Sequence, residues 1–262
     1  MRAMDQDSPH RVLFGLPVRA ETMGQAVAGI EQILLERGAR PVLHLALNAA
    51  KVSQIERDPG FRELISGFDR IHADGAPIVW ASRLLDRPLP ERIAGIDLML
   101  RLVERSAERG WRPYFLGARP EAVAACVARL CARWPALSVA GSHDGFWDEA
   151  DPAAEAAVVA AVRAARADLL FVALPTPRKE RFLLRHREAL GVPFAMGVGG
   201  SFDVIAGRVK RAPEAWQAAG MEWAYRLLQE PRKMWKRYLF TNLHFAWLIA
   251  REVVRGSGPQ PR

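Results

Sequence analysis

Short apolar runs alternate with longer amphipathic segments along most of this 262-residue chain, and this alternation restricts the fold more than any other feature. Runs typical of strands occur at Val12–Leu16, Val42–Leu47, Arg70–His72, Pro113–Leu116, Leu137–Ala140, Leu169–Leu174 and Pro193–Val198. Helical periodicity occupies Thr22–Arg37, Ala76–Leu85, Asp97–Arg109, Glu121–Trp134, Ala153–Arg166 and Lys179–Leu190. Such alternation is typical of βαβ units. The sequence therefore predicts an α/β fold with a doubly wound, mostly parallel, Rossmann-like sheet.

The end of the chain differs from the rest in charge. From Arg208 onward there are eleven Lys or Arg and four Asp or Glu residues, whereas the whole protein has a formal net charge of +8. Four of the eight Trp residues lie in the same segment. A nearly neutral body argues against nucleic acid as a partner, and a basic, Trp-rich helical end suits a membrane surface or a phosphate group. A solvated charged helix is the alternative.

We therefore expect an α/β domain that carries the site, residues 1–207, followed by a basic helical appendage, residues 208–262. With 50% hydrophobic residues the chain can bury a full core. No apolar run reaches the ~18–20 residues that a membrane span needs. The first ten residues contain no apolar signal segment. Because Cys126 and Cys131 suit neither a disulfide nor a metal site, we expect a reducing cytoplasm.

Polar residues and glycines follow the predicted strands. In parallel sheets, ligands bind outside the carboxyl ends of the strands, so these residues should surround one cleft. Glycines there let backbone N–H groups approach a phosphate. The candidates for a nucleotide cleft are Asn48, Asp74, Gly117, Gly145, Lys179, Glu180, Gly199, Gly200 and Asp203.

Asp74 is the most specific candidate in this set. A carboxylate at a strand end is a candidate general base. Its alternative role is to cap the helix expected from Ala76. Arg92 and Asp97 meet near another helix start, where a surface ion pair plus a helix cap is the alternative.

Several familiar sites are absent from the sequence. No GxGxxG opens a helix, which counts against NAD, and no GxSxG supplies a nucleophile. Asp5 and Asp7 form an Asp-x-Asp triplet, but they lie in a polar tail outside any strand, and no other spacing resembles a metal cage. The histidines are far apart in sequence, and His143 is the one we expect nearest the cleft. These patterns favour general-base chemistry with electrostatic stabilisation and no metal or cofactor.

Six segments, in this order, resemble the WecG/TagA/CpsF glycosyltransferases (glycosyltransferase family 26): NAAKV, ADGAP, ERIAGID, YFLGARPE, GVGGSFDVIAGRVKRAP and GMEWAYRLLQEPRKMWKRY. The resemblance extends from about Val12 to Tyr238. It implies a hexosyltransferase that uses a UDP-sugar of the N-acetylmannosamine, N-acetylmannosaminuronate or glucose type. The acceptor would be a polyprenyl-diphosphate-linked sugar at the inner face of the cell membrane, for exopolysaccharide or another cell-surface polysaccharide. The family further implies inversion at the sugar and no metal.

The resemblance also implies residue roles. Asp74 would deprotonate the acceptor hydroxyl, Asn48 would hold a sugar near it, and Arg92 would face the diphosphate. The glycine turn and Asp203 would shape the nucleotide pocket. The appendage would close over the site and meet the acceptor diphosphate and the membrane through Arg211, Arg226, Arg232, Lys233 and Arg237.

Two positions depart from the family pattern. Ala46 stands where relatives often have a hydroxyl residue, and Lys179 stands where many have Gln, which adds charge near the donor. The donor sugar, the acceptor glycan and self-association into homo-oligomers remain open. The alternative functions are a nucleotide-binding oxidoreductase or epimerase, and a non-catalytic membrane-docking module.

Overall fold

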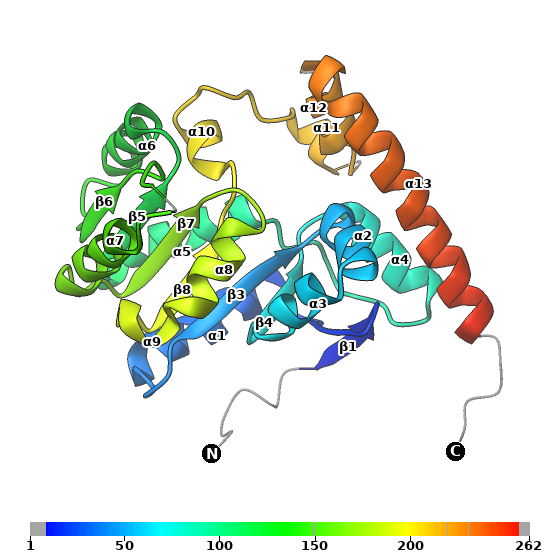
Figure 1. The fold of residues 1–262 in the computed structure, drawn as a ribbon, viewed down its shortest axis with the longest axis horizontal. Coiled ribbons are helices and arrows are strands. Elements are labelled where there is room, and N and C mark those ends of the chain that lie inside the picture. The colour runs from blue at the N-terminus through cyan, green and yellow to red at the C-terminus, as the bar shows by residue number, and fades with distance from the viewer. Residues whose placement is uncertain (1–8, 149, 219, 230, 257–262) are drawn as a thin grey trace.

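The computed structural model describes residues 9–148, 150–218, 220–229 and 231–256, without the side chains of 218, 226, 232–234, 236–238, 255 and 256. Within these ranges a six-stranded sheet forms the centre, with helices on both faces (Figure 1). Its strands are β3 (Val42–Leu47), β4 (Arg70–Ala73), β5 (Pro113–Gly117), β6 (Gly141–His143), β7 (Leu169–Ala173) and β8 (Phe194–Gly197). The spatial order is β4-β3-β8-β7-β5-β6, and all neighbours are parallel. The predicted α/β, Rossmann-like fold is confirmed.

Helices follow most of the strands and cover them. The described helices are α1 (Met23–Glu36), α2 (Ala49–Arg57), α3 (Pro59–Ser66), α4 (Ala76–Leu84), α5 (Gly95–Arg109), α6 (Pro120–Arg133), α7 (Pro152–Ala164), α8 (Arg178–Arg185), α9 (Arg187–Leu190), α10 (Ser201–Ile205), α11 (Glu214–Ala218), α12 (Glu222–Gln229) and α13 (Pro231–Gly256). The start of α1 is a capping box, in which Thr22 accepts a hydrogen bond from the Gln25 N–H and the Gln25 side chain binds the Thr22 N–H.

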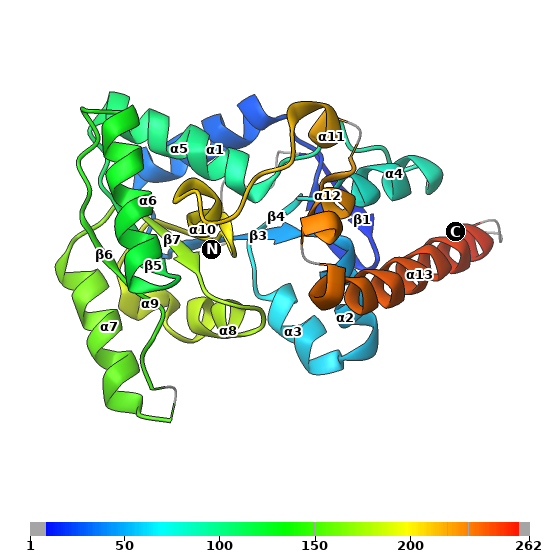
Figure 2. The same ribbon diagram turned by 90° about the horizontal axis from the view of Figure 1, so that it is seen from above.

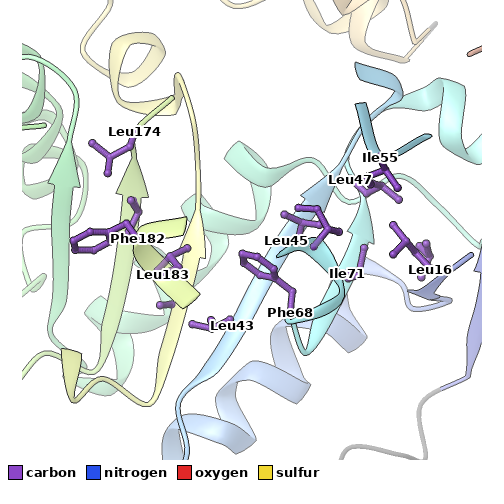
Figure 3. Close-up of a cluster of buried hydrophobic side chains, with 14 of the residues drawn as sticks. Leu16, Leu43, Leu45, Leu47, Ile55, Phe68, Ile71, Leu174, Phe182 and Leu183 are labelled. Atoms are coloured by element: carbon purple, nitrogen blue, oxygen red, sulfur yellow. The ribbon is translucent and has the colours of Figure 1, made fainter. Parts of the chain in front are cut away.

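Two hydrophobic clusters lie on opposite faces of the sheet, because successive strand side chains point to opposite sides. In β5, Tyr114 and Leu116 belong to one cluster and Phe115 to the other. Figure 3 shows the first cluster, where Leu45 of β3 lies beside Phe68 and Leu47 lies beside Ile55 of α2. The second cluster packs α1, α5 and α6 against the other face.

The prediction of a single strand at Val12–Leu16 was wrong, because the chain reverses direction within this segment. The segment is an antiparallel hairpin of β1 (His10–Leu13) and β2 (Leu16–Arg19), separate from the central sheet. Its two turn residues, Phe14 and Gly15, have φ of 52° and 76°. A two-residue turn with both φ angles positive reverses the chain inside the apolar run.

Two other predicted elements are shifted or divided. The strand expected at Leu137–Ala140 is β6, three residues long and displaced to Gly141–His143, where Gly141 fits against the ring of Tyr114. The helix expected at Lys179–Leu190 divides at His186 into α8 and α9. The His186 ring contacts Glu155 of α7 at 2.6 Å, which holds the break in place.

The appendage packs against the body through its last helix. Helix α13 lies against α2 and α4 (Figure 1). Its Phe245 and Leu248 are buried in the same cluster as the β3 leucines. Ser53 bonds to His244 at 2.7 Å, and Glu56 pairs with Arg251 at 2.7 Å. The end of the chain therefore contributes to the hydrophobic core.

Candidate active site

A cavity of about 870 Å³ opens at the carboxyl ends of β3, β4, β7 and β8. This is the edge where ligands bind in doubly wound sheets. The appendage supplies another wall, since Tyr225 and Gln229 of α12 and Thr241 of α13 also line the cavity. Figures 1 and 2 show α11 and α12 beyond the carboxyl end of β3. Body and appendage therefore enclose one site.

Asp74 follows β4 and lines this cavity. Its Oδ1 accepts a hydrogen bond of 2.7 Å from the Gly95 N–H, at the first residue of α5. It does not cap α4, whose N-cap is Gly75 without a side-chain bond. Among the described residues Oδ2 has no hydrogen-bond partner. One oxygen thus fixes the carboxylate at a positive helix end, and the other is free for a substrate.

Asn48 lies beside Asp74 because their strands are neighbours in register. The Asp74 N–H donates to Leu47 O at 2.8 Å. Asn48 caps α2, with Oδ1 accepting from the Lys51 N–H at 3.1 Å, and it also lines the cavity. Its amide NH₂ group is left to donate to a ligand. Ala46, one of the two departures from the family pattern, lines the cavity as well.

Two buried lysines line the cavity near the carboxyl end of β8, and a buried glutamate stands behind them. Lys51 Nζ and Lys179 Nζ lie 3.3 Å and 3.0 Å from Glu180 Oε1. Lys51 and Lys179 line the cavity, and Glu180 does not. Burial opposes the negative charge of Glu180, but the two ammonium groups hold its pKa below the usual value. Burial, and then the nearby Lys51, lower the pKa of Lys179 to about 8.

The predicted glycines divide into two groups. Gly199 and Gly200 line the cavity, and Gly199 has a φ of 54° that favours glycine. Asp203 lines the cavity too. Gly117 and Gly145 do not line it: a Cβ on Gly117 would lie 2.6 Å from the Ala173 backbone, and one on Gly145 would lie 2.8 Å from Leu174. These two glycines allow close packing of the loops behind the cavity.

Charged residues join the body to the appendage at the cavity rim. Arg92 pairs with Glu222 at 2.6 Å and lies 3.9 Å from Asp97. Arg211 pairs with Asp97 at 2.7 Å. Arg211 and Glu222 line the cavity, whereas Arg92 and Asp97 stand behind them. The predicted ion pair of Arg92 and Asp97 is thus part of a larger network, and Asp97 is not a helix cap, since the N-cap of α5 is Ala94.

The remaining predicted cations lie outside what the structure describes. The side chains of Arg226, Arg232, Lys233 and Arg237 are not among the described ones, and Asp5 and Asp7 precede residue 9. Among the described side chains, the exposed face of α13 is apolar, with exposed Trp235, Leu239, Phe240, Leu243, Trp247 and Val254. None of the described helices has the length and apolarity needed to cross a bilayer.

The histidines differ from the expectation. His44 Nε2 lies 2.9 Å from His72 Nδ1, and His72 Nε2 lies 3.0 Å from Glu21 Oε2. All three side chains are buried. Burial lowers the pKa of both imidazoles. His143 does not line the cavity and instead packs against Trp147. In the described part of the chain, no three His, Cys, Asp or Glu side chains group so as to hold a metal ion.

Sequence reasoning missed several cavity residues. Among them are Lys51, Gln54, Arg57, Lys210, Tyr225 and Thr241. Lys51 lies three residues after Asn48, in the first turn of a helix that was not predicted. Recognising Asn48 as a helix N-cap would have placed Lys51 beside the strand end.

The parallel sheet and the polar cavity at its carboxyl edge define a doubly wound α/β protein with a ligand site in the usual place for that class. The chain matches the model of the glycosyl transferase WecG/TagA/CpsF family over residues 11–258. It belongs to this family and is a glycosyltransferase, with a nucleotide-sugar donor and a sugar acceptor.

Proposed function

We propose that this protein transfers a sugar from a UDP-sugar to a polyprenyl-diphosphate-linked acceptor in bacterial exopolysaccharide or related cell-surface polysaccharide synthesis. The observation that carries the proposal is the Asp74 carboxylate, oriented by Gly95 and facing a cavity large enough for a nucleotide sugar. Family membership supplies the reaction class.

In the proposed reaction Asp74 Oδ2 takes the proton of the acceptor hydroxyl. The resulting oxygen attacks the anomeric carbon as the bond from that carbon to the UDP phosphate oxygen breaks. Attack on the face opposite the leaving UDP inverts the configuration. Asn48, with its free amide donors, would hold a sugar hydroxyl beside Asp74. The cavity-lining cations Lys51, Arg57, Lys179, Lys210 and Arg211 would offset the charge that develops on the diphosphate.

A panel of UDP-sugars incubated with lipid-linked acceptors, with products identified by mass spectrometry, tests the proposal. One donor and acceptor pair should give a product heavier by one sugar, with release of UDP. Absence of product from every pair, in a protein that binds UDP, would favour the docking-module alternative.

We expect transfer to persist in EDTA and after deletion of residues 1–8. The reason is that the cavity-lining Lys and Arg side chains can neutralise a diphosphate directly. The measurement is the UDP release rate with and without chelator, compared with rates after adding Mg²⁺ or Mn²⁺. A strict requirement for either metal would contradict metal independence.

We also propose that the protein binds the inner face of the cell membrane through the outer face of α13. That helix combines exposed aromatic and aliphatic side chains with a basic sequence. Such a helix lies in the interface, with its apolar side among the acyl chains and its cations at anionic headgroups.

Neutralising Arg232, Lys233, Lys236 and Arg237 together should weaken binding to anionic liposomes strongly. Each cation near an anionic surface contributes about 1 kcal/mol, and salt screens the effect. Co-sedimentation at low and high salt, with neutral liposomes in parallel, measures it. Equal binding by mutant and wild type at both salt concentrations would contradict membrane attraction by these residues.

A further inference from the structure

Two ammonium groups share one carboxylate at the cavity wall. Lys51 Nζ and Lys179 Nζ both lie within ion-pair distance of the same oxygen, Glu180 Oε1, at 3.3 Å and 3.0 Å. All three side chains are at least nine-tenths buried. Only the lysines line the cavity, so Glu180 stands behind them. This local cluster therefore presents one uncompensated positive charge to the cavity.

The geometry fixes both lysines and leaves donors unused. Lys51 Nζ also donates to Ala46 O at 2.7 Å, and Lys179 Nζ also donates to Thr176 Oγ1. Gly197 lets the Lys179 stem pass, since a Cβ there would lie 2.9 Å from Lys179 Cδ. An ammonium group has three N–H donors. Each lysine thus keeps one donor for a ligand.

A buried excess charge is unfavourable until a counter-charge arrives. Burial and the Lys51 ammonium lower the pKa of Lys179 to about 8. Besides Lys51, the charged groups that act on Lys179 are Glu180 and, more weakly, Asp74. No ion pair joins Asp74 to Lys179 within the described residues, and Asp74 Oδ1 accepts its hydrogen bond from the Gly95 N–H. The missing counter-charge is therefore one that a ligand can bring.

We infer that Lys51 and Lys179 form an anion subsite, which binds an oxyanion of the sugar donor, either a phosphate of its diphosphate or a carboxylate on its sugar. The inference rests on the proposed function in taking a nucleotide sugar as the ligand. Both oxyanions accept charge-assisted hydrogen bonds from ammonium groups.

Calorimetric titration with UDP, UDP-glucose and UDP-glucuronate shows whether the oxyanion is a phosphate or a sugar carboxylate. UDP-glucuronate differs from UDP-glucose only in carrying a carboxylate where the glucose has a neutral hydroxymethyl group. Lys179→Gln should weaken binding about 10-fold or more, as for loss of a charged hydrogen bond. Weakening of all three ligands assigns the subsite to phosphate. Weakening of UDP-glucuronate alone assigns it to the carboxylate.

Arg181→Gln is the matched control, because Arg181 is exposed on the same helix as Lys179 and does not line the cavity. It should weaken each ligand less than about 3-fold, since water screens an exposed charge. Lys51→Gln provides a second variant with the same expected pattern, should Lys179→Gln fail to fold. Unchanged affinities for all three ligands in the folded lysine variants would overturn the subsite alone. A wild-type protein that binds none of them would overturn the proposed UDP-sugar donor as well.

A pH series adds an independent readout. The Lys179 ammonium is charged below its pKa of about 8 and loses its proton above it. Wild-type affinity should therefore fall as the pH rises through that value, while Lys179→Arg, which keeps its charge, should stay constant. Parallel profiles for the two proteins would count against Lys179 as the anion-binding cation.

Discussion

Asp74→Asn is expected to lower the transfer rate by about 10²-fold or more and to leave folding and UDP binding intact. The asparagine oxygen can still accept the 2.7 Å bond from the Gly95 N–H, so the geometry survives. An amide cannot take the acceptor proton, so the chemical step fails. Turnover is measured by UDP release under saturating substrates, and binding by calorimetry.

Asp58→Asn is the matched control for this substitution. Asp58 Oδ1 accepts a 3.0 Å bond from the Phe61 N–H at the start of α3, and it does not line the cavity. Asn caps helices about as well as Asp, so both stability and activity should stay near wild type. A folded Asp74→Asn protein with turnover like that of Asp58→Asn would rule out Asp74 as the base.

Leu248→Ala is expected to destabilise the protein by about 2–5 kcal/mol, as for other buried leucines. Leu248 of α13 has 0% exposure and belongs to the same hydrophobic cluster as the β3 leucines. Truncation removes apolar burial and leaves a cavity between the appendage and the body. The free energy of unfolding from urea titration measures the loss.

Leu243→Ala on the same helix is the control, because it makes the same change in helix propensity without removing a buried side chain. Leu243 is 62% exposed, so its truncation should change the free energy of unfolding by about 0.5 kcal/mol or less. Equal effects of the two substitutions would show that α13 is not an integral part of the core.

The sheet was predictable because its four central strands, β3, β5, β7 and β8, are mostly apolar and buried on both sides. The second strand of the hairpin, β2, could not be predicted, because Gly15 lies inside one apolar run and only its positive φ reveals the turn. The position of β6 depended on the fit of Gly141 against Tyr114, a contact between residues far apart in the chain. Periodicity carries no information about such contacts.

The rule that ligands bind at the carboxyl ends of parallel strands selected five residues that line one cavity in the structure: Asn48, Asp74, Lys179, Gly199 and Gly200. It also selected Gly117 and Gly145, because a glycine needed for tight packing looks the same in sequence as one needed for ligand approach. The pairing of His44 with His72 was missed for a related reason. Their contact exists only because β3 and β4 are neighbours in register, with Ala46 opposite His72.

The bond from the Gly95 N–H to Asp74 also bears on how this enzyme tolerates mutation. A backbone donor persists through any substitution at its own position except proline, which lacks the N–H. Even a methyl group at position 95 would meet Ala46 only at an ordinary contact distance of 3.4 Å. Side chains such as Lys179, the proposed donor contact, can be replaced by single codon changes. Orientation of Asp74, the proposed base, is therefore robust to mutation at position 95, and laboratory evolution can vary the cavity's side chains without disturbing it.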